Sequence, residues 1–155
     1  MLYSKMAVIC IRFGKHVVNA EYETSLDDFD NKTKHKVGVG IYTPIGDGYS
    51  YSALWCSNKL PGGTLGSGIA IKNKKGKDFE GNYDVLYFVE QVTNDRPFNV
   101  EIVKEKDGYK LTWFQNGKKL CHGMGYKVNE SLCFAWGDND AKFSCKIEDF
   151  LNDNI

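Results

Sequence analysis

The sequence predicts an all-β protein folded as a closed or nearly closed antiparallel up-and-down barrel, and three observations lead to this prediction. Apolar and polar residues alternate with a period of two along almost the whole chain, which is typical of half-buried strands. Aromatic residues make up 14% of the chain, which has 16 glycines but only 3 prolines. This balance favours antiparallel strands joined by glycine turns. The third observation is an internal repeat.

The middle of the chain matches itself at an offset of about sixty residues. An Asp-Gly-Tyr triplet occurs in both copies, Tyr22 matches Tyr83, and Trp55 matches Trp113. The matches define two copies at about 17–72 and 80–137. Each copy alone would leave an apolar face in water, whereas two copies together can enclose one core. We therefore expect two similar halves within one domain that spans residues 1–155.

Turn signals separate the predicted strands. The Asp-Gly pairs at 47–48 and 107–108 supply the positive φ that tight hairpins need, and Asn116-Gly117 is the strongest hairpin signal in the chain. Tyr49, Tyr51, Ala53 and Trp55 alternate with other residues and are expected to share one face of a strand. By the same rules we expect eleven strands, at about 6–13, 17–25, 36–43, 48–56, 64–72, 80–89, 98–104, 108–114, 119–128, 131–136 and 141–147.

Connections of hairpin length favour a simple meander, and a meander that closes into a barrel leaves no strand edge exposed. A two-layer β-sandwich is the alternative, because it buries the same alternating faces. Sandwiches with Greek-key topology need longer crossings between their sheets, which this chain does not provide at regular places.

Charge and apolar runs exclude several classes of protein. The chain carries 20 basic and 20 acidic residues, so its formal net charge is zero and it lacks the basic excess on which nucleic-acid binding depends. No apolar run reaches the length of a transmembrane helix, and the run at 7–11 is too short for a signal peptide because Arg12 ends it. We expect a protein without nucleic-acid or membrane partners.

Cysteine usage indicates the compartment. The five cysteines are odd in number and form no Cys-x-x-Cys pair, whereas secreted disulfide scaffolds usually contain an even count. Reduced thiols in a cytoplasmic protein are the expected state.

Glycine and aromatic residues recur in the second copy in a pattern that resembles small barrel proteins of the calycin type, which include lipocalins and avidins. The resemblance is clearest over residues 80–137 and weaker over 19–72. It implies an antiparallel β-barrel. The segments that carry it are Gly81-Asn82-Tyr83-Asp84-Val85, Tyr109-Lys110-Leu111-Thr112-Trp113, Asn116-Gly117, Gly123-Met124-Gly125 and Ala135-Trp136-Gly137.

The sequence contains no recognisable catalytic, metal or nucleotide motif. Cys121 and His122 are adjacent, but neighbouring side chains on a strand point to opposite faces and cannot form a Cys-His dyad. The acidic stretch 138–140 lacks the other ligands of a calcium loop and is typical of a turn. We therefore expect a protein that is not an enzyme and that has no metal or cofactor.

Aromatic residues are the remaining functional signal. Barrels of about eight strands are just wide enough to hold one small ligand, and rings on the inner face would line its cavity. The alternative is that the same rings fill the interior and pack on one another. A non-catalytic binding protein for a small, mainly apolar ligand, held in the barrel or at its mouth, is the function that we expect. The candidate ligand-binding residues are Tyr51, Trp55, Tyr87, Trp113 and Trp136.

Some predicted strands are apolar on both faces. Leu86 and Phe88 lie opposite the face of Tyr83, Val85 and Tyr87, and residues 6–13 are apolar on both sides. Such strands need cover on both faces. This pattern predicts a homodimer and gives the alternative function, a structural or protein-interaction module that oligomerises through its apolar outer strands.

Overall fold

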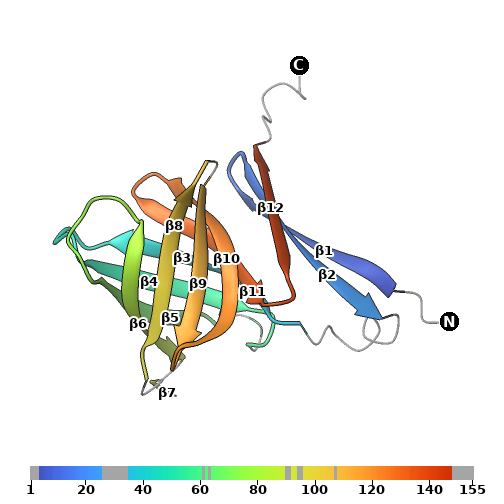
Figure 1. The fold of residues 1–155 in the computed structure, drawn as a ribbon, viewed down its shortest axis with the longest axis horizontal. Helices are drawn as coiled ribbons and strands as arrows, with labels where there is room; N and C mark the ends of the chain where they lie inside the picture. The colour runs from blue at the N-terminus through green and yellow to red at the C-terminus, as the bar shows by residue number, and fades with distance from the viewer. Residues whose placement is uncertain are drawn as a thin grey trace.

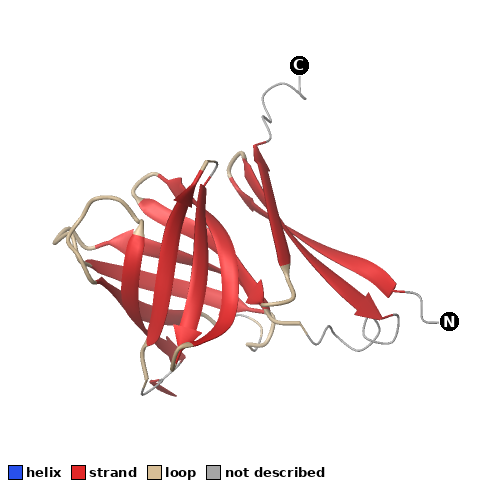
Figure 2. Ribbon diagram, viewed as in Figure 1, coloured by secondary structure: helices blue, strands red, loops and turns tan. Residues whose placement is uncertain are grey.

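The computed structural model describes residues 4–25, 35–60, 62, 64–89, 92–93, 96–106 and 108–147, and it confirms the all-β prediction. Figure 2 shows that the elements in these residues are strands joined by turns and loops, without a helix. The strands are β1 (Ser4–Phe13), β2 (His16–Ser25), β3 (Val37–Pro44), β4 (Ser50–Ser57), β5 (Gly66–Lys72), β6 (Gly81–Val89), β7 (Val92–Thr93), β8 (Phe98–Glu105), β9 (Gly108–Gln115), β10 (Lys118–Val128), β11 (Ser131–Asp138) and β12 (Lys142–Ile147).

Eight strands form a closed antiparallel up-and-down barrel, as Figure 1 shows. Each of β3, β4, β5, β6, β8, β9, β10 and β11 pairs with the next, and β11 pairs with β3 to close the barrel. The two-residue strand β7 pairs with the end of β6. The barrel is confirmed against the sandwich, and its architecture is compatible with a calycin-type fold.

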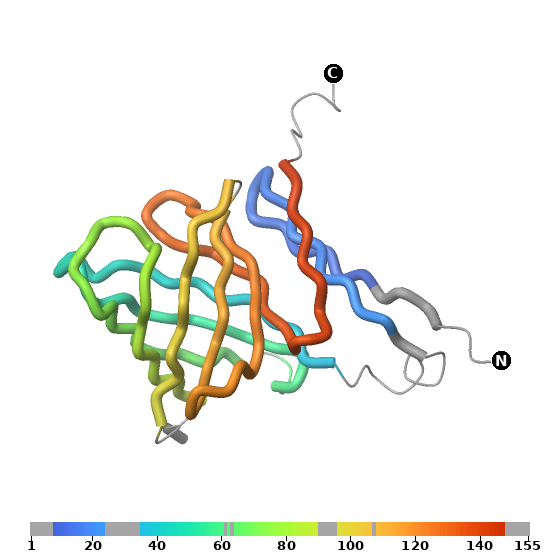
Figure 3. Tube along the Cα trace, in the orientation of Figure 1, coloured from blue at the N-terminus to red at the C-terminus, as the bar shows by residue number. Residues whose placement is uncertain are grey.

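The remaining strands form a three-stranded sheet in the order β1-β2-β12, which lies against the outside of the barrel (Figures 1 and 3). Val18 on β2 packs with Tyr126 and Ala135, which point outward from β10 and β11. The barrel therefore covers the inner face of this small sheet, including Ile11 and Phe13. On the outer face Val8 and Cys10 are exposed.

Each of the eleven predicted segments corresponds to a strand, and β7 is additional. The predicted hairpin at Asn116-Gly117 is confirmed, because both residues have positive φ, 52° and 75°, and Lys118 pairs with Gln115. The sequence did not separate β1, β2 and β12 from the barrel. Alternation reveals which face of a strand is buried, but it does not reveal which strand lies beside it.

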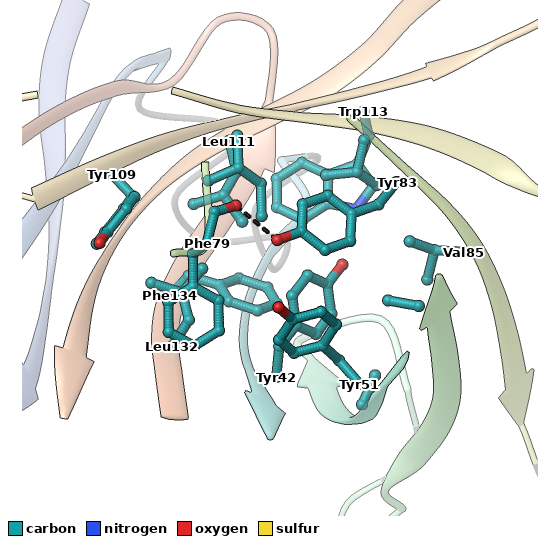
Figure 4. Packing of buried hydrophobic residues seen from close by; sticks show 14 of the residues in the cluster. Tyr42, Tyr51, Phe79, Tyr83, Val85, Tyr109, Leu111, Trp113, Leu132 and Phe134 are labelled. Atoms are coloured by element: carbon teal, nitrogen blue, oxygen red, sulfur yellow. Dashed lines mark hydrogen bonds between the residues drawn. The ribbon is translucent and has the colours of Figure 1, made fainter. Parts of the chain in front are cut away.

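Glycines on two barrel strands make room for the rings inside. A Cβ atom at Gly40 would lie 2.4 Å from the Phe134 ring, and one at Gly66 would lie 2.1 Å from the Trp55 ring. At Gly125 on β10 the nearest atoms would be the backbone carbonyl oxygen of Cys133 and Cβ of Phe134, so this glycine permits close approach of β10 and β11. Side chains of alternating size are one way to fill a small barrel. Figure 4 shows the resulting core, in which aromatic rings from opposite walls meet.

The predicted repeat corresponds to the barrel only in part. Trp55 and Trp113 both point inward, each from the middle strand of a three-stranded meander, β3-β4-β5 or β8-β9-β10. Tyr22, which the repeat matches with Tyr83, lies on β2 in the small sheet, whereas Tyr83 lies inside the barrel. The duplication itself stays a prediction.

Candidate functional site

The two ends of the barrel differ, and the end crossed by the connection from β5 to β6 is closed. Phe79 in this connection is only 3% exposed and inserts among the rings of Tyr51 and Tyr109, at centroid distances of 5.6 and 5.9 Å. The Tyr83 hydroxyl donates a hydrogen bond to the backbone carbonyl of Phe79, 2.6 Å away, which Figure 4 shows as a dashed line. We call this the closed end.

Asp78 fixes the same connection to the barrel wall. Its carboxylate accepts a hydrogen bond from the Tyr109 hydroxyl at 2.9 Å, and its backbone carbonyl accepts one from Lys72 Nζ at 2.5 Å. Lys104 Nζ lies 3.7 Å from the carboxylate. Burial by itself would raise the pKa of Asp78, but hydrogen bonds from Glu80 and Tyr109 outweigh it and lower the pKa. The carboxylate is therefore charged at neutral pH and holds the closed end in place.

Partly exposed aromatic rings lie at the opposite end, which we call the mouth. Trp55, Tyr87 and Phe98 are partly buried, and Trp136 is 8% exposed. The rings meet edge to face: Tyr87 lies 5.8 Å from Trp55 and 5.6 Å from Phe98, and Trp55 lies 6.4 Å from Trp136. Lys36 Nζ lies 5.3 Å from the centroid of the Trp136 ring, which suits a cation–π contact.

Hydrogen bonds orient the side chains of Trp55 and Tyr87. Trp55 Nε1 donates to the backbone carbonyl of Ser67 at 3.0 Å, which holds the indole against the Cβ-free backbone of Gly66. Deeper in the barrel, Trp113 Nε1 donates to the Tyr87 hydroxyl oxygen at 2.8 Å, and the hydroxyls of Tyr42 and Tyr87 lie 2.5 Å apart. We call these three residues the Tyr42–Tyr87–Trp113 cluster.

The tyrosines of this cluster are neutral. Burial raises the pKa of Tyr42 well above its ordinary value and also raises that of Tyr87. At physiological pH both hydroxyls therefore keep their hydrogens and can donate hydrogen bonds.

The structure brings four of the five predicted ligand-binding residues together. Trp55, Tyr87 and Trp136 lie at the mouth, and Trp113 contacts Tyr87 from below. Tyr51 does not join them, because it packs against Phe79 and Tyr83 at the closed end.

Sequence reasoning missed two residues of the site. Tyr42 follows Gly38 and Gly40 on the inner face of β3, a row of glycines and one aromatic residue that predicts contact with rings from another strand. Phe98 begins β8 directly after Pro97, at a position where alternation gives little signal.

Cys121 and His122 point to opposite faces of β10, as predicted. Cys121 packs on the barrel core, where burial raises the pKa of its thiol to about 12. His122 faces the small sheet, with its ring 5.1 Å from that of Phe143. Among the residues that the structure describes, no group of three or more His, Cys, Asp or Glu side chains is placed to hold a metal ion.

No family model matches this chain, and no match was found among curated proteins or solved structures. Within the described residues, no helix is long and apolar enough to cross a membrane.

Proposed function

We propose that this is a non-catalytic binding protein that takes a small, mainly apolar molecule at the mouth of its barrel. The observation that carries the proposal is the difference between the two ends. Phe79 closes one end, whereas the aromatic rings of Trp55, Tyr87 and Phe98 keep part of their surface accessible at the other. Ligand sites are typically apolar and aromatic with a few oriented polar groups.

The packing of the core supports a ligand position at the mouth of the barrel and not deep in its interior. Tyr42, Leu111 and Phe134 are buried at the centre of the barrel, so rings and aliphatic side chains fill its interior. A barrel of eight strands is wide enough to hold one small ligand, so we expect one ligand per barrel.

Apolar contact at the mouth would give modest affinity. A molecule that removes about 200 Å² of apolar surface from water gains roughly 5 kcal/mol by the usual area relation. Loss of translational and rotational freedom offsets part of that gain, so we expect dissociation constants in roughly the millimolar range for simple probes.

The test uses α-methylstyrene, a small neutral hydrocarbon, and the indole N–H signals of the three tryptophans in ¹⁵N NMR spectra. We expect saturable shifts of the Trp55 and Trp136 signals as the probe is added. The matched variants Phe98→Leu, at the mouth, and Phe79→Leu, at the closed end, locate the site. Phe98→Leu should weaken binding, and Phe79→Leu should leave it unchanged. No saturable shift, or equal effects of the two variants, would refute a ligand site at the mouth.

A specific surface feature favours a second function, assembly into a homodimer. Leu54 on β4, which is 52% exposed, and Ile69 and Ile71 on β5 point outward, next to Leu86 and Phe88 on β6. Ile69 lies directly opposite Leu86 across the strand pair. A row of exposed apolar residues over neighbouring strands is typical of an interaction site.

Sedimentation at micromolar concentration tests the dimer. We expect a species of twice the 17.5 kDa chain mass, which Ile69→Lys dissociates because it places a charge in a desolvated contact. Val103→Lys is the matched control, since Val103 is also an exposed apolar residue, on β8. A single species of chain mass for the unmodified protein would exclude the homodimer.

We also propose a cytoplasmic location. All five cysteines are free thiols in the structure, which supports a reducing compartment.

A further inference from the structure

The Tyr42–Tyr87–Trp113 cluster contains more hydrogen-bond donors than its own bonds use. Its donors are the indole N–H of Trp113 and the hydroxyl hydrogens of Tyr42 and Tyr87. Trp113 donates to Tyr87, and one hydroxyl hydrogen is used between the two tyrosines. One hydroxyl hydrogen therefore remains available.

The surroundings of the spare hydrogen are aromatic. Tyr42 is completely buried, and its ring contacts the edge of Phe134 at a centroid distance of 4.8 Å. Tyr87 lies between the rings of Trp55 and Phe98. A buried donor that lacks an acceptor costs about 1–3 kcal/mol, so this hydroxyl needs an oxygen or nitrogen from outside the cluster.

Tyr87 is the member of the pair that an entering molecule meets first. Tyr42 has no exposed surface, whereas Tyr87 keeps some exposed surface at the mouth beside Trp55. The Tyr87 hydroxyl lies below that surface, within the cluster, so an acceptor has to pass the Tyr87 ring to reach it. When Tyr42 donates to Tyr87, the Tyr87 oxygen accepts two hydrogen bonds and its own hydrogen is the spare one. A hydroxyl that accepts hydrogen bonds is polarised and becomes a better donor.

From this count we infer, on the basis of the proposed function, that the mouth selects neutral molecules that carry one hydrogen-bond acceptor, such as the carbonyl of a ketone or an ester. The carbonyl oxygen accepts the spare hydrogen of the Tyr42–Tyr87 pair, and the apolar part of the molecule lies against Trp55 and Phe98. A neutral acceptor fits better than a carboxylate, because an ion would lose its hydration among these rings.

Two probes of the same shape test this inference. Acetophenone and α-methylstyrene differ only in that a carbonyl oxygen replaces a methylene group. In ¹⁵N NMR titrations we expect both probes to shift the indole signals of Trp55 and Trp136. Only acetophenone should shift the signal of Trp113, because its indole donates to the hydroxyl that binds the carbonyl. This comparison uses the unmodified protein and does not depend on the folding of a variant.

Variants then assign the effect to one hydroxyl. In Tyr87→Phe we expect the affinity for acetophenone, relative to that for α-methylstyrene, to fall about threefold to tenfold, as loss of one hydrogen bond predicts. Tyr51→Phe removes a hydroxyl at the closed end and should leave the ratio unchanged.

The outcomes separate this inference from the proposed function. If neither probe shifts an indole signal, the binding function fails and the inference fails with it. If both probes bind, but they move the Trp113 signal alike and Tyr87→Phe keeps the affinity ratio, the binding function stands and the acceptor preference is overturned. The spare hydroxyl would then serve a buried water.

Discussion

Replacement of Gly40 by alanine tests whether rings fill the barrel as the structure shows. The new Cβ atom would lie 2.4 Å from Cζ of Phe134, whereas ordinary contacts of this kind begin at 3.4 Å. The ring would have to move by about an ångström to restore a normal contact. Phe134 is only 2% exposed and is held by Tyr42 and Trp113, so it has little room to move.

The expected cost follows from this overpacking. An extra methyl group in a well-packed core costs about 1–3 kcal/mol, and the gain from replacing a strand glycine is roughly 0.5–1 kcal/mol. The two effects leave a net cost of about 0–2.5 kcal/mol, and because Phe134 has little room to move we expect Gly40→Ala to lower the free energy of unfolding by about 1–2 kcal/mol.

Urea unfolding measures this change. Gly62→Ala is the control, because a Cβ atom there meets no other atom within 4 Å, and it should leave stability nearly unchanged. Combining Gly40→Ala with Phe134→Leu should cost less than the sum of the two single changes, since a smaller side chain relieves the clash. Equal stability of Gly40→Ala and the unmodified protein would mean that the ring does not occupy this space.

Two further predictions concern titratable groups. Burial lowers the pKa of His122 from its ordinary 6.5, so the unfolded chain takes up this proton more readily than the folded protein. The neutral His122 side chain therefore makes its full contribution to the free energy of unfolding above pH 6.5, and this contribution is lost as the pH falls through the lower pKa of the folded state. The urea midpoint should accordingly decrease between about pH 7.5 and pH 5.5. His122→Gln should reduce that decrease, and an unchanged pH profile in the variant would contradict the assignment. For the thiols, we expect iodoacetamide to modify exposed Cys10 first in the folded protein and Cys121 much later, because burial restricts access to Cys121 and raises its pKa to about 12. Mass spectrometry of timed samples checks this order, which rapid labelling of Cys121 would contradict.

The sequence alone determined the strands and most of their turns. Alternation over a few residues placed Tyr49, Tyr51, Ala53 and Trp55 on one face. The structure confirms that face for Tyr51, Ala53 and Trp55, whereas Tyr49 precedes β4 and is 41% exposed. The Asn116-Gly117 pair predicted its hairpin because positive φ is a local requirement that few residues meet. Both signals act within one strand or one turn, so they can be interpreted without knowledge of the neighbouring strands.

Tertiary structure decided which strands are neighbours and which residues meet. Sequence reasoning grouped Tyr51 with Trp55 as site residues, but the two point to opposite ends of the barrel, because alternation gives the face of a residue and not its partners across the interior. It also missed that Gly40 makes room for Phe134, which is far away in the sequence and lies beside it only once β11 pairs with β3. The sequence also did not separate the small sheet of β1, β2 and β12 from the barrel. The strands of both sheets have similar alternating patterns, and the fit of side chains that meet only in the folded chain decides which sheet a strand joins.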